Sequence, residues 1–495
     1  MSLNLSYLFK LDYLSSFVIL AVIIFSVLVI IYSLRFMAGK ARLLQYYIWI
    51  ILTAIASIGA VLANNLILLL VLWGFLGFTL YLLINMGGKD SEQAAKKTFI
   101  IIGGSDCLML LGVAIIYSLS GTFQMDKIRL SISHEPLPVI AYLCIAIACF
   151  AKAGAMPFHS WIPDCAESAP VPVVAFLPAS LDKLLGIYLL ARVSLDLFLL
   201  NQAMHIFLML IGAFTIVAAV MMALVQHNFK RLLGYHAVSQ VGYMVLGIGT
   251  GVPIGIAGAI FHMLNNAVYK SCLFLTGGNV ESQAKTSELG QLGGLAKVMP
   301  VTYLSCLIAS FAISGVPPFN GFVSKWMIYQ GLISQLSAGS FGLRLTTVLC
   351  LVAAMIGSSL TLASFMKLIH AVFLGQRLKD KGQTDANISE VHWTMWLPCL
   401  ILAGICVLFG VFAFQIPLKQ FILPSLATRY SLLAADFPGF WSSGLTSALI
   451  IAGLILGLLI FKLSKLKLSF RQDSPFVGGE TDVLEKSRGF RNGIL

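Results

Sequence analysis

Five lysines stand inside apolar stretches of the sequence, where a charged side chain needs a chemical reason. They are Lys152, Lys183, Lys270, Lys325 and Lys367. A lysine at the centre of a lipid bilayer costs roughly 2.5–3.5 kcal/mol on insertion scales. A lysine near a helix end can instead extend its ammonium group to the interface, and Lys367, close to Gly375, fits that explanation best. Five such lysines in one chain favour a functional role.

Buried lysines of this kind are suited to proton transfer. Burial lowers the pKa of a lysine and a nearby carboxylate raises it, so a carboxylate that moves or changes charge switches the lysine between holding and releasing a proton. Asp106 lies in the apolar segment GGSDCLML. Asp182 adjoins Lys183, but successive helix residues do not face each other. Asp164 and Glu167 fall between two apolar runs and are equally well explained as loop residues.

A second polar group follows helical spacing in the segment FHMLNNAVYK. His262, Asn265, Asn266 and Lys270 fall at i, i+3, i+4 and i+8, which places them on one face of a helix. A lone histidine in an apolar helix is usually a core residue, but a polar stripe that ends in a lysine favours a hydrated path. The preceding apolar segment adds further polar residues to this lining, although Ser239 and Gly242 suit helix packing equally well; these residues are Tyr235, His236, Ser239, Gln240 and Tyr243.

The composition places these groups in a polytopic membrane protein. Of 495 residues, 59% are hydrophobic and 11% are charged, and the mean hydropathy is +0.93. Apolar stretches of about 20 residues are separated by short loops, which leaves no room for a soluble catalytic domain. The net charge of +12 is spread over these loops, so it does not indicate nucleic-acid binding. The nine cysteines form no CxxC pair, so we expect no cofactor, metal or redox centre in this chain.

The apolar stretches predict an all-α fold of about 13 to 14 transmembrane helices. We place the crossings near residues 14–34, 44–63, 65–86, 97–119, 137–156, 171–194, 203–226, 232–250, 253–276, 299–336 (broken), 345–374, 394–416 and 442–463. Twenty-seven of the 32 basic residues then sort into loops, and alternate loops are strongly enriched in them. By the positive-inside rule, the amino terminus lies outside and the carboxyl terminus in the cytoplasm of a plasma (inner) membrane.

An internal repeat divides the chain into two halves. Gly154, Pro157, Phe158 and Trp161 have the spacing G-x-x-P-F-x-x-aromatic, which recurs at Gly315, Pro318, Phe319 and Phe322. Paired interruptions of apolar spans are typical of transporters built from inverted repeats, whose ion sites lie at the breaks. We therefore expect two inverted five-helix repeats, each with a broken helix.

These features suggest a division of the chain into five segments. They are the N-terminal helices at 1–64, the first repeat at 65–198, the second repeat at 199–375, the C-terminal helices at 376–463 and a cytoplasmic tail at 464–495.

Four motifs together resemble a known family. KAGAMPFHSWIPDCAESAPVPVVAFLPASLDKLLGIYLLAR, NFKRLLGYHAVSQVGYMVLGIG, FHMLNNAVYKSCLFLTGG and PPFNGFVSKW are similar to the antiporter-like proton-pumping subunits. These subunits are shared by respiratory complex I, energy-converting hydrogenases and multisubunit sodium/proton antiporters. The resemblance implies that Lys152, Lys183, Lys270 and Lys325 are the successive pump, connecting, central and exit lysines. It also implies roles in proton translocation for Asp106 and His262; the secondary candidates are Asp182, Asp164, Glu167, His236, Asn266 and Lys367.

Two positions depart from the family pattern. Gly74 stands where the family usually has a glutamate, and Asn266 where a second histidine is common. Without that glutamate, either Asp106 takes its place beside Lys152, or another subunit supplies the acid, or the chain has lost pumping.

Three functions fit these observations. The first is a non-catalytic, proton-translocating subunit of a redox-driven complex, in which protons enter at Lys152 or Lys183, pass His262 and Lys270, and leave past Lys325. The second is a sodium/proton antiporter subunit, and the third is a structural spacer. The expected partners are other membrane subunits, including antiporter-like siblings and a redox arm, together with protons or sodium ions and the lipid bilayer.

Overall fold

The computed structural model describes residues 5–132, 135–337, 340–375, 388–427, 430 and 443–463. The chain divides into one compact unit up to Ser447 and a second unit from Ala448. The helix α18 (Ser443–Leu463) begins at the end of the first unit and forms the described part of the second. The predicted cytoplasmic tail, 464–495, lies outside the described residues.

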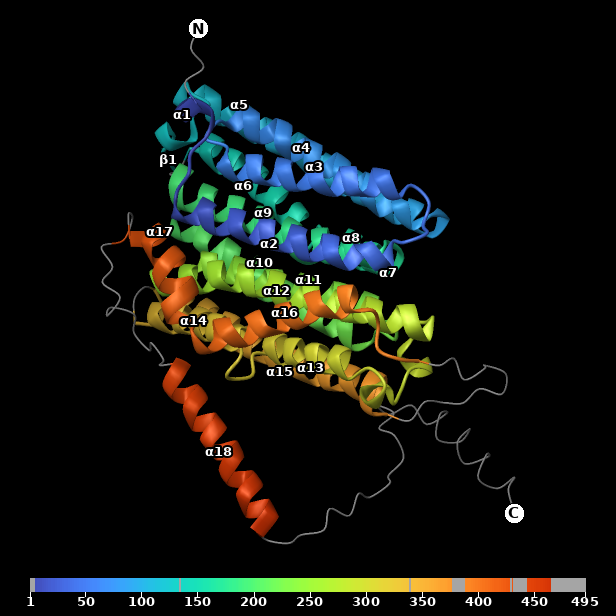
Figure 1. Ribbon diagram of the computed structural model, residues 1–495. Coiled ribbons are helices and arrows are strands. Elements are labelled where there is room, and N and C mark those ends of the chain that lie inside the picture. The colour runs from blue at the N-terminus through green and yellow to red at the C-terminus, as the bar shows by residue number, and fades with distance from the viewer. Residues whose placement is uncertain are drawn as a thin grey trace. The chain divides into compact units, whose positions relative to one another are not determined.

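The first unit is a bundle of long helices whose axes run in similar directions (Figure 1). Its first half contains α1 (Leu5–Leu8), α2 (Tyr13–Phe36), α3 (Leu43–Leu62), α4 (Leu66–Ile84), α5 (Lys89–Ser120), α6 (Pro136–Ala153), α7 (Trp161–Ser168), α8 (Val171–Phe176) and α9 (Asp182–Arg192). The π-helical segment Leu177–Leu181 joins α8 to α9. Two short strands, β1 (Leu130–Ser131) and β2 (Phe198–Leu199), pair in parallel at one end of the bundle.

The second half continues with further long helices. They are α10 (Gln202–Leu224), α11 (Phe229–Gly249), α12 (Pro253–Ala284), α13 (Pro300–Ser314), α14 (Asn320–Gln335), α15 (Phe341–Ile369), α16 (Trp393–Val411) and α17 (Leu423–Ala427). The expected spans therefore appear as helices, and the span predicted at 299–336 is broken into α13 and α14. The predicted all-α fold is confirmed.

Nine helices in the described residues are long and apolar enough to cross a membrane. A helix suits a bilayer because it satisfies its own backbone hydrogen bonds. Helices α11 and α12 do not meet this criterion because of their polar side chains, and α13 and α14 do not meet it because they are short. All four lie around the second break. The segment boundaries at 64, 198 and 375 stay predictions.

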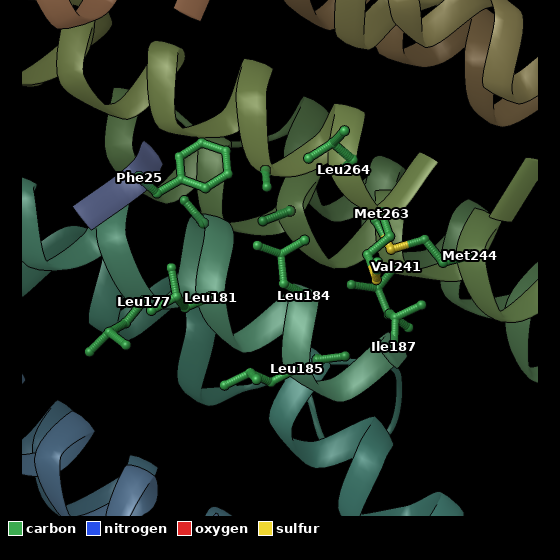
Figure 2. Close-up of a cluster of buried hydrophobic side chains, with 14 of the residues drawn as sticks. Phe25, Leu177, Leu181, Leu184, Leu185, Ile187, Val241, Met244, Met263 and Leu264 are labelled. Atoms are coloured by element: carbon green, nitrogen blue, oxygen red, sulfur yellow. The ribbon is translucent and has the colours of Figure 1, made fainter. Parts of the chain in front are cut away.

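Helix α12 lies at the centre of the first unit. It packs against α2, α8, α9, α11, α13, α14 and α16, and every residue from Ile254 to Val280 is buried. Apolar side chains such as Leu184, Met244 and Met263 fill the space between α9, α11 and α12 (Figure 2). The polar residues of α12 therefore face protein on all sides, which explains why its sequence lacks a single apolar stripe.

One end of the bundle is fixed by Asp12, the residue before α2. Its carboxylate accepts a hydrogen bond from the Ser15 backbone N–H at 2.9 Å and lies 2.5 Å from an Arg192 nitrogen. Arg192 also contacts Asp196 at 3.1 Å. Burial raises the pKa of the Asp12 carboxyl, but Arg192 and the hydrogen bonds lower it by more, so the net pKa lies below its ordinary value.

We expect Asp12→Ala to lower stability by roughly 1–2 kcal/mol, because the change removes a helix cap and an ion pair together. Asp12→Asn keeps the cap and should cost less. Because the folded pKa is depressed, the ion-pair contribution is present above the unfolded pKa of about 4 and is lost as pH falls through the folded value. Thermal unfolding of wild type and Asp12→Asn in detergent should converge in acid. A gap that stays constant from neutral pH to about pH 3 would contradict this prediction.

Candidate functional site

The first break begins where α6 ends at Ala153. Gly154 has φ +87°, in the left-handed region that favours glycine. The backbone N–H groups of Gly154 and Ala155 both donate to the Phe150 carbonyl, at 2.7 and 2.9 Å, and Phe158 donates to Ala155 at 2.9 Å. The chain is thereby turned out of the helix before it starts again at Trp161.

The second break repeats this geometry. Gly315 has φ +79°, Val316 donates to the Phe311 carbonyl at 3.1 Å, and Phe319 donates to Val316 at 3.1 Å. The bonds of Val316 and Phe319 match those of Ala155 and Phe158 residue for residue. The two GxxPF motifs therefore form equivalent backbone turns, as their spacing predicts. The inverted order of the surrounding helices stays a prediction.

Each glycine leaves room for a lysine from another part of the chain. A Cβ at Gly154 would lie 3.8 Å from the Lys183 Nζ and against Ile162, and a Cβ at Gly315 would lie 3.7 Å from the Lys325 Nζ. The breaks thus combine two properties: the backbone turns away from helical geometry, and an ammonium group lies beside the turn.

Lys152, at the end of α6, has two acidic neighbours. Its side chain is fully buried, and its Nζ lies 5.1 Å from the centre of the Trp73 ring. It interacts electrostatically with Asp182 and Asp106, and a Cβ at Gly77 would lie 3.5 Å from the Asp106 carboxylate. Asp106 and Asp182 therefore act on Lys152 through their charge, whereas its Nζ has no hydrogen-bond partner in the described residues.

Gly74 itself faces away from this group. It is exposed in the single chain, and a Cβ there would meet no atom within 4 Å. Asp106 and Asp182 are thus carboxylates of this chain that act on Lys152, and the three explanations for the missing glutamate stay predictions.

Lys183 continues the line from the first half. It is fully buried, its Nζ lies 5.9 Å from the centre of the Trp161 ring, and it interacts electrostatically with Asp182. The charge of Asp182 therefore acts on both Lys152 and Lys183, although Asp182 is next to only Lys183 in the sequence. Lys183 also interacts with Lys270 of the second half.

Lys270 and His236 form the middle of the line. The Lys270 Nζ donates to the Leu233 carbonyl at 2.9 Å. The His236 Nε2 lies 2.7 Å from the Ser364 hydroxyl. The charges of Lys270 and Lys325 both act on His236, while its Nε2 is hydrogen-bonded to Ser364. The structure thus gives His236 a more central place than the secondary one that its sequence position indicates.

His262 lies on the side of this line that faces the second break. Its Nδ1 lies 2.9 Å from the Ser324 hydroxyl, and its Nε2 lies 3.1 Å from the Gln240 side-chain oxygen. Asn266 points elsewhere, with its amide 3.5 Å from the Ala179 carbonyl. The residues predicted to share one face of α12 therefore contact different elements. His262 contacts α11 and α14, whereas Asn266 contacts the segment before α9.

Lys325 closes the line in α14. It is 2% exposed, its Nζ donates to the Ile313 carbonyl at 2.9 Å, and it lies 4.7 Å from the centre of the Tyr243 ring. A cation at this carbonyl is favourable because Ile313 belongs to the last turn of α13, the negative end of that helix dipole. In the described residues this lysine forms no ion pair with a carboxylate.

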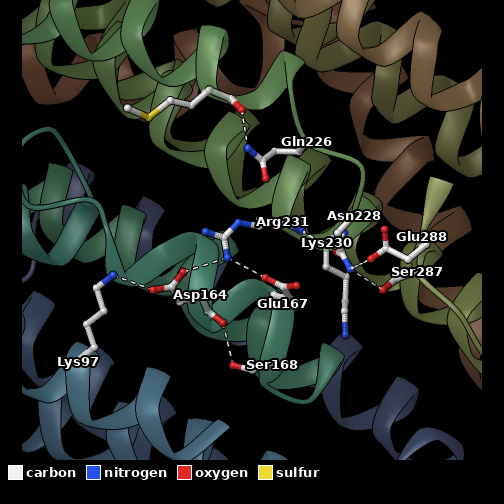
Figure 3. Close-up of polar contacts among 11 residues, drawn as sticks. Lys97, Asp164, Glu167, Ser168, Gln226, Asn228, Lys230, Arg231, Ser287 and Glu288 are labelled. Carbon is white, nitrogen blue, oxygen red and sulfur yellow. Dashed lines mark hydrogen bonds and ion pairs between the residues drawn. The ribbon is translucent and has the colours of Figure 1, made fainter. Parts of the chain in front are cut away.

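Three of the predicted residues lie outside the buried line. Asp164 and Glu167 belong to α7 and pair with Arg231 at 3.1 and 2.8 Å, and Asp164 also meets Lys97 at 2.7 Å (Figure 3). Lys367 is exposed and donates to the Leu224 carbonyl at 3.2 Å. The network around Arg231 joins α5, α7 and α11, so Asp164 and Glu167 are more than loop residues.

Three residues that contact the line have no recognisable signal in the sequence. Trp73 covers Lys152, Ser324 contacts His262, and Ser364 contacts His236. Each comes from a different helix, and single serines and tryptophans in apolar spans are too common to identify alone. Taken together, the site is a set of buried titratable groups, with carboxylates among those of the first half and with carbonyls and hydroxyls bonded to those of the second. Such a set can pass protons between neighbouring groups.

We expect Gly315→Ala to lower both stability and ion transport. A left-handed conformation costs a residue with a Cβ roughly 1–2 kcal/mol, and the added carbon would lie 3.1 Å from the Lys325 Cδ. Gly404→Ala in α16 is the matched control, because a Cβ there meets nothing within 4 Å. Thermal unfolding and vesicle transport assays would check both variants, and equal behaviour of the two would contradict the role assigned to the turn.

Comparison with known proteins gives a consistent result. The family described as "NADH:quinone oxidoreductase/Mrp antiporter, TM" matches residues 63–350. A Na(+)/H(+) antiporter subunit A1 from Staphylococcus haemolyticus is 32% identical over 78% of this chain and 50% of its own length. A Na(+)/H(+) antiporter subunit from Bacillus subtilis is 29% identical over 86% of this chain and 56% of its own length. The chain thus spans about half the length of the curated relatives it matches.

Solved structures share the fold at low identity. The Mrp complex of Dietzia contains a chain that aligns with a TM-score of 0.76, 22% identity and coverage of 85% of this chain and 84% of that one. A chain of the archaeal membrane-bound sulfane sulfur reductase aligns with a TM-score of 0.79, 22% identity and coverage of 95% and 77%. A chain of respiratory complex I from Thermus thermophilus aligns with a TM-score of 0.66 and 23% identity, and the alignment covers 82% of this chain and 86% of that one.

These matches confirm the predicted resemblance and the multi-pass membrane fold. The family match covers more than half of the sequence, including both breaks and the buried lysines. The chain belongs to the NADH:quinone oxidoreductase/Mrp antiporter transmembrane family.

Proposed function

We propose that this protein is a proton-translocating, antiporter-like subunit of a larger membrane complex. The observation that carries the proposal is the burial of four lysines, Lys152, Lys183, Lys270 and Lys325, together with the titratable side chains Asp182, His236 and His262. Ionisable residues inside a membrane protein are costly and are retained mainly for ion pathways. The chain itself is non-catalytic in this proposal, so the energy comes from its partners.

Proton transfer would begin among the groups of the first half. Asp106 and Asp182 stabilise charge on Lys152, and movement of either carboxylate would promote release of its proton. The proton would then pass through Lys183 to Lys270. From there, His236 and His262 are the titratable groups next to Lys325, which would release the proton on the outer side. In the predicted topology, with the amino terminus outside and the carboxyl terminus in the cytoplasm, protons would move from the cytoplasm to the outside of the plasma membrane.

Two kinds of parent complex fit this role. The curated relatives are named Na(+)/H(+) antiporter subunits and include matches near 30% identity, which favours a multisubunit sodium/proton antiporter. The structural matches to the sulfane sulfur reductase and complex I favour a redox-driven complex through fold alone. In both, the partners would be other membrane subunits, including antiporter-like siblings. A redox arm belongs only to the second.

Replacing the end members of the line tests proton translocation. In vesicles that contain the whole complex, Lys152→Ala and Lys325→Ala should each lower proton flux at least about tenfold, because each interrupts a relay of acid–base groups. Lys367→Ala is the matched control, since that lysine is exposed and lies off the line; its flux should match wild type. Unchanged flux in both buried-lysine variants would support the structural-spacer alternative and contradict the proposal.

Purification of the intact complex in mild detergent separates the two parent complexes. A sodium/proton antiporter should yield only membrane subunits, without iron–sulfur or nickel–iron absorbance. A redox-driven complex should yield a soluble arm with those centres. We expect the first result, and co-purification of a stoichiometric iron–sulfur subunit would contradict it.

A further inference from the structure

Six side-chain hydroxyl groups lie along α15, and they bond in two different ways. Four of them donate to the carbonyl of the residue four positions earlier; they belong to Thr346, Thr347, Ser359 and Thr361. This bond within the helix is the usual one for a serine or threonine in a helix interior. Ser358 and Ser364 instead bond to ring side chains of other helices. These two hydroxyls are therefore the ones that α15 uses to hold its neighbours.

The Ser364 hydroxyl contacts one edge of the His236 ring. It lies 2.7 Å from the His236 Nε2, and both side chains are fully buried. The next residue, Phe365, packs against the same ring, with the two ring centroids 4.7 Å apart. Two adjacent residues of α15 thus hold the histidine, one at a ring nitrogen and the other through ring contact.

The ring that Ser364 holds lies beside Lys270. The Lys270 Nζ is 5.7 Å from the centre of the Phe365 ring, so Phe365 lies against both the lysine and the histidine. The same Nζ donates to the carbonyl of Leu233, which is one helical turn from His236 on the same face of α11. With Nε2 engaged by Ser364, the His236 Nδ1 is the ring nitrogen without a hydrogen-bond partner in the described residues. The bond at one ring nitrogen decides the protonation of the other, so Ser364 selects the tautomer of His236.

Ser358 makes the second contact of this kind. The Tyr243 hydroxyl donates to the Ala354 carbonyl at 2.7 Å and lies 2.9 Å from the Ser358 hydroxyl. The hydroxyl of Tyr329 in α14 lies 2.6 Å from the same serine oxygen. Gly357 allows this approach, because a Cβ there would lie 3.0 Å from the Tyr243 oxygen. Helix α15 therefore holds the hydroxyl end of Tyr243.

The ring of Tyr243 in turn contacts Lys325. The Lys325 Nζ lies 4.7 Å from the centre of this ring, and the ring also packs against His262 with centroids 5.5 Å apart. The face of an aromatic ring stabilises a nearby ammonium group. Lys325 and Tyr329 are four residues apart on α14, so they lie on the same face of that helix. The orientation of the Tyr243 ring relative to Lys325 therefore depends on Ser358.

We infer that Ser364 and Ser358 are positioning residues for proton transfer in the second half. Ser364 keeps the His236 ring beside Lys270 in one neutral tautomer, and Ser358 keeps the Tyr243 ring at Lys325. Neither serine carries a proton along the line. This role goes further than the proposed function but rests on it, because it takes His236 and Lys325 as members of the proton path.

Ser364→Ala tests the first contact in vesicles that contain the whole complex. Proton flux should fall about tenfold, because a misplaced transfer group slows the reaction strongly. Thr361→Val is the matched control, since it removes a buried hydroxyl whose bond in the described residues is to its own helix; its flux should match wild type. Nitrogen NMR with ¹⁵N-labelled histidine gives the second readout, and a His236→Gln variant assigns the signal. The neutral His236 ring should hold one tautomer in wild type and in Thr361→Val, and a mixture of both in Ser364→Ala.

A positioning role requires both changes. Reduced flux with the wild-type tautomer would indicate a structural effect alone and would overturn the inference. Mixed tautomers with wild-type flux, a mixture already present in wild type, or no change in either readout would overturn it as well. Failure of the proposed function looks different, because Lys325→Ala would then leave proton flux unchanged.

Ser358→Ala covers the case in which Ser364→Ala does not assemble. It should lower proton flux about fivefold, as expected for the loss of one hydrogen bond, and Tyr243→Phe should do the same because it keeps the ring and removes the hydroxyl. Both changes break the same contact, so flux in the double variant should equal that of the more affected single variant. Ser359→Ala is the control, since its exposed hydroxyl bonds to α15 itself. Wild-type flux in Ser358→Ala, a similar loss in Ser359→Ala, or effects that multiply in the double variant would overturn the role of Ser358.

Discussion

The burial of ammonium groups among membrane helices is the constraint on which the rest of this structure depends. Lys152, Lys183 and Lys270 are fully buried, and Lys325 is 2% exposed. An ammonium group in such a place needs a carboxylate, a carbonyl or a ring face within reach. The first half supplies carboxylates, whereas the second supplies the Leu233 and Ile313 carbonyls. The two halves thus stabilise their buried ammonium groups with different partners.

The architecture follows from this requirement. A regular helix uses its carbonyls internally, so a carbonyl becomes available to a lysine where a helix ends. The turn at Gly315 creates such an end, where the Ile313 carbonyl accepts from Lys325, whereas Lys270 donates to the Leu233 carbonyl within α11. Helix α12, buried on every side, then brings Lys270 and His262 between the two breaks.

The helices and the two turns could be predicted from the sequence. Hydropathy located the helices within a few residues, because span length is set by the bilayer. The GxxPF repeat identified two equivalent turns, because glycine in the left-handed region leaves a local signature. The electrostatic effect of Asp182 on Lys152 was not accessible, since it depends on how α6 packs against α9. The contacts of His236 with Ser364 and of Asn265 with Asn320 likewise join helices far apart in sequence, and no local pattern encodes such packing.

The protonation state of the buried lysines tests most directly whether they carry protons. Nitrogen NMR of the complex in lipid nanodiscs, with ¹⁵N label at the lysine Nζ, distinguishes ammonium from neutral amine. Single Lys→Arg variants would assign the signals of Lys152, Lys183, Lys270 and Lys325. If the buried line carries protons, at least one of these lysines changes between the two forms over the pH range in which the complex transports ions. If all four keep one fixed protonation state throughout that range, the buried line does not carry protons.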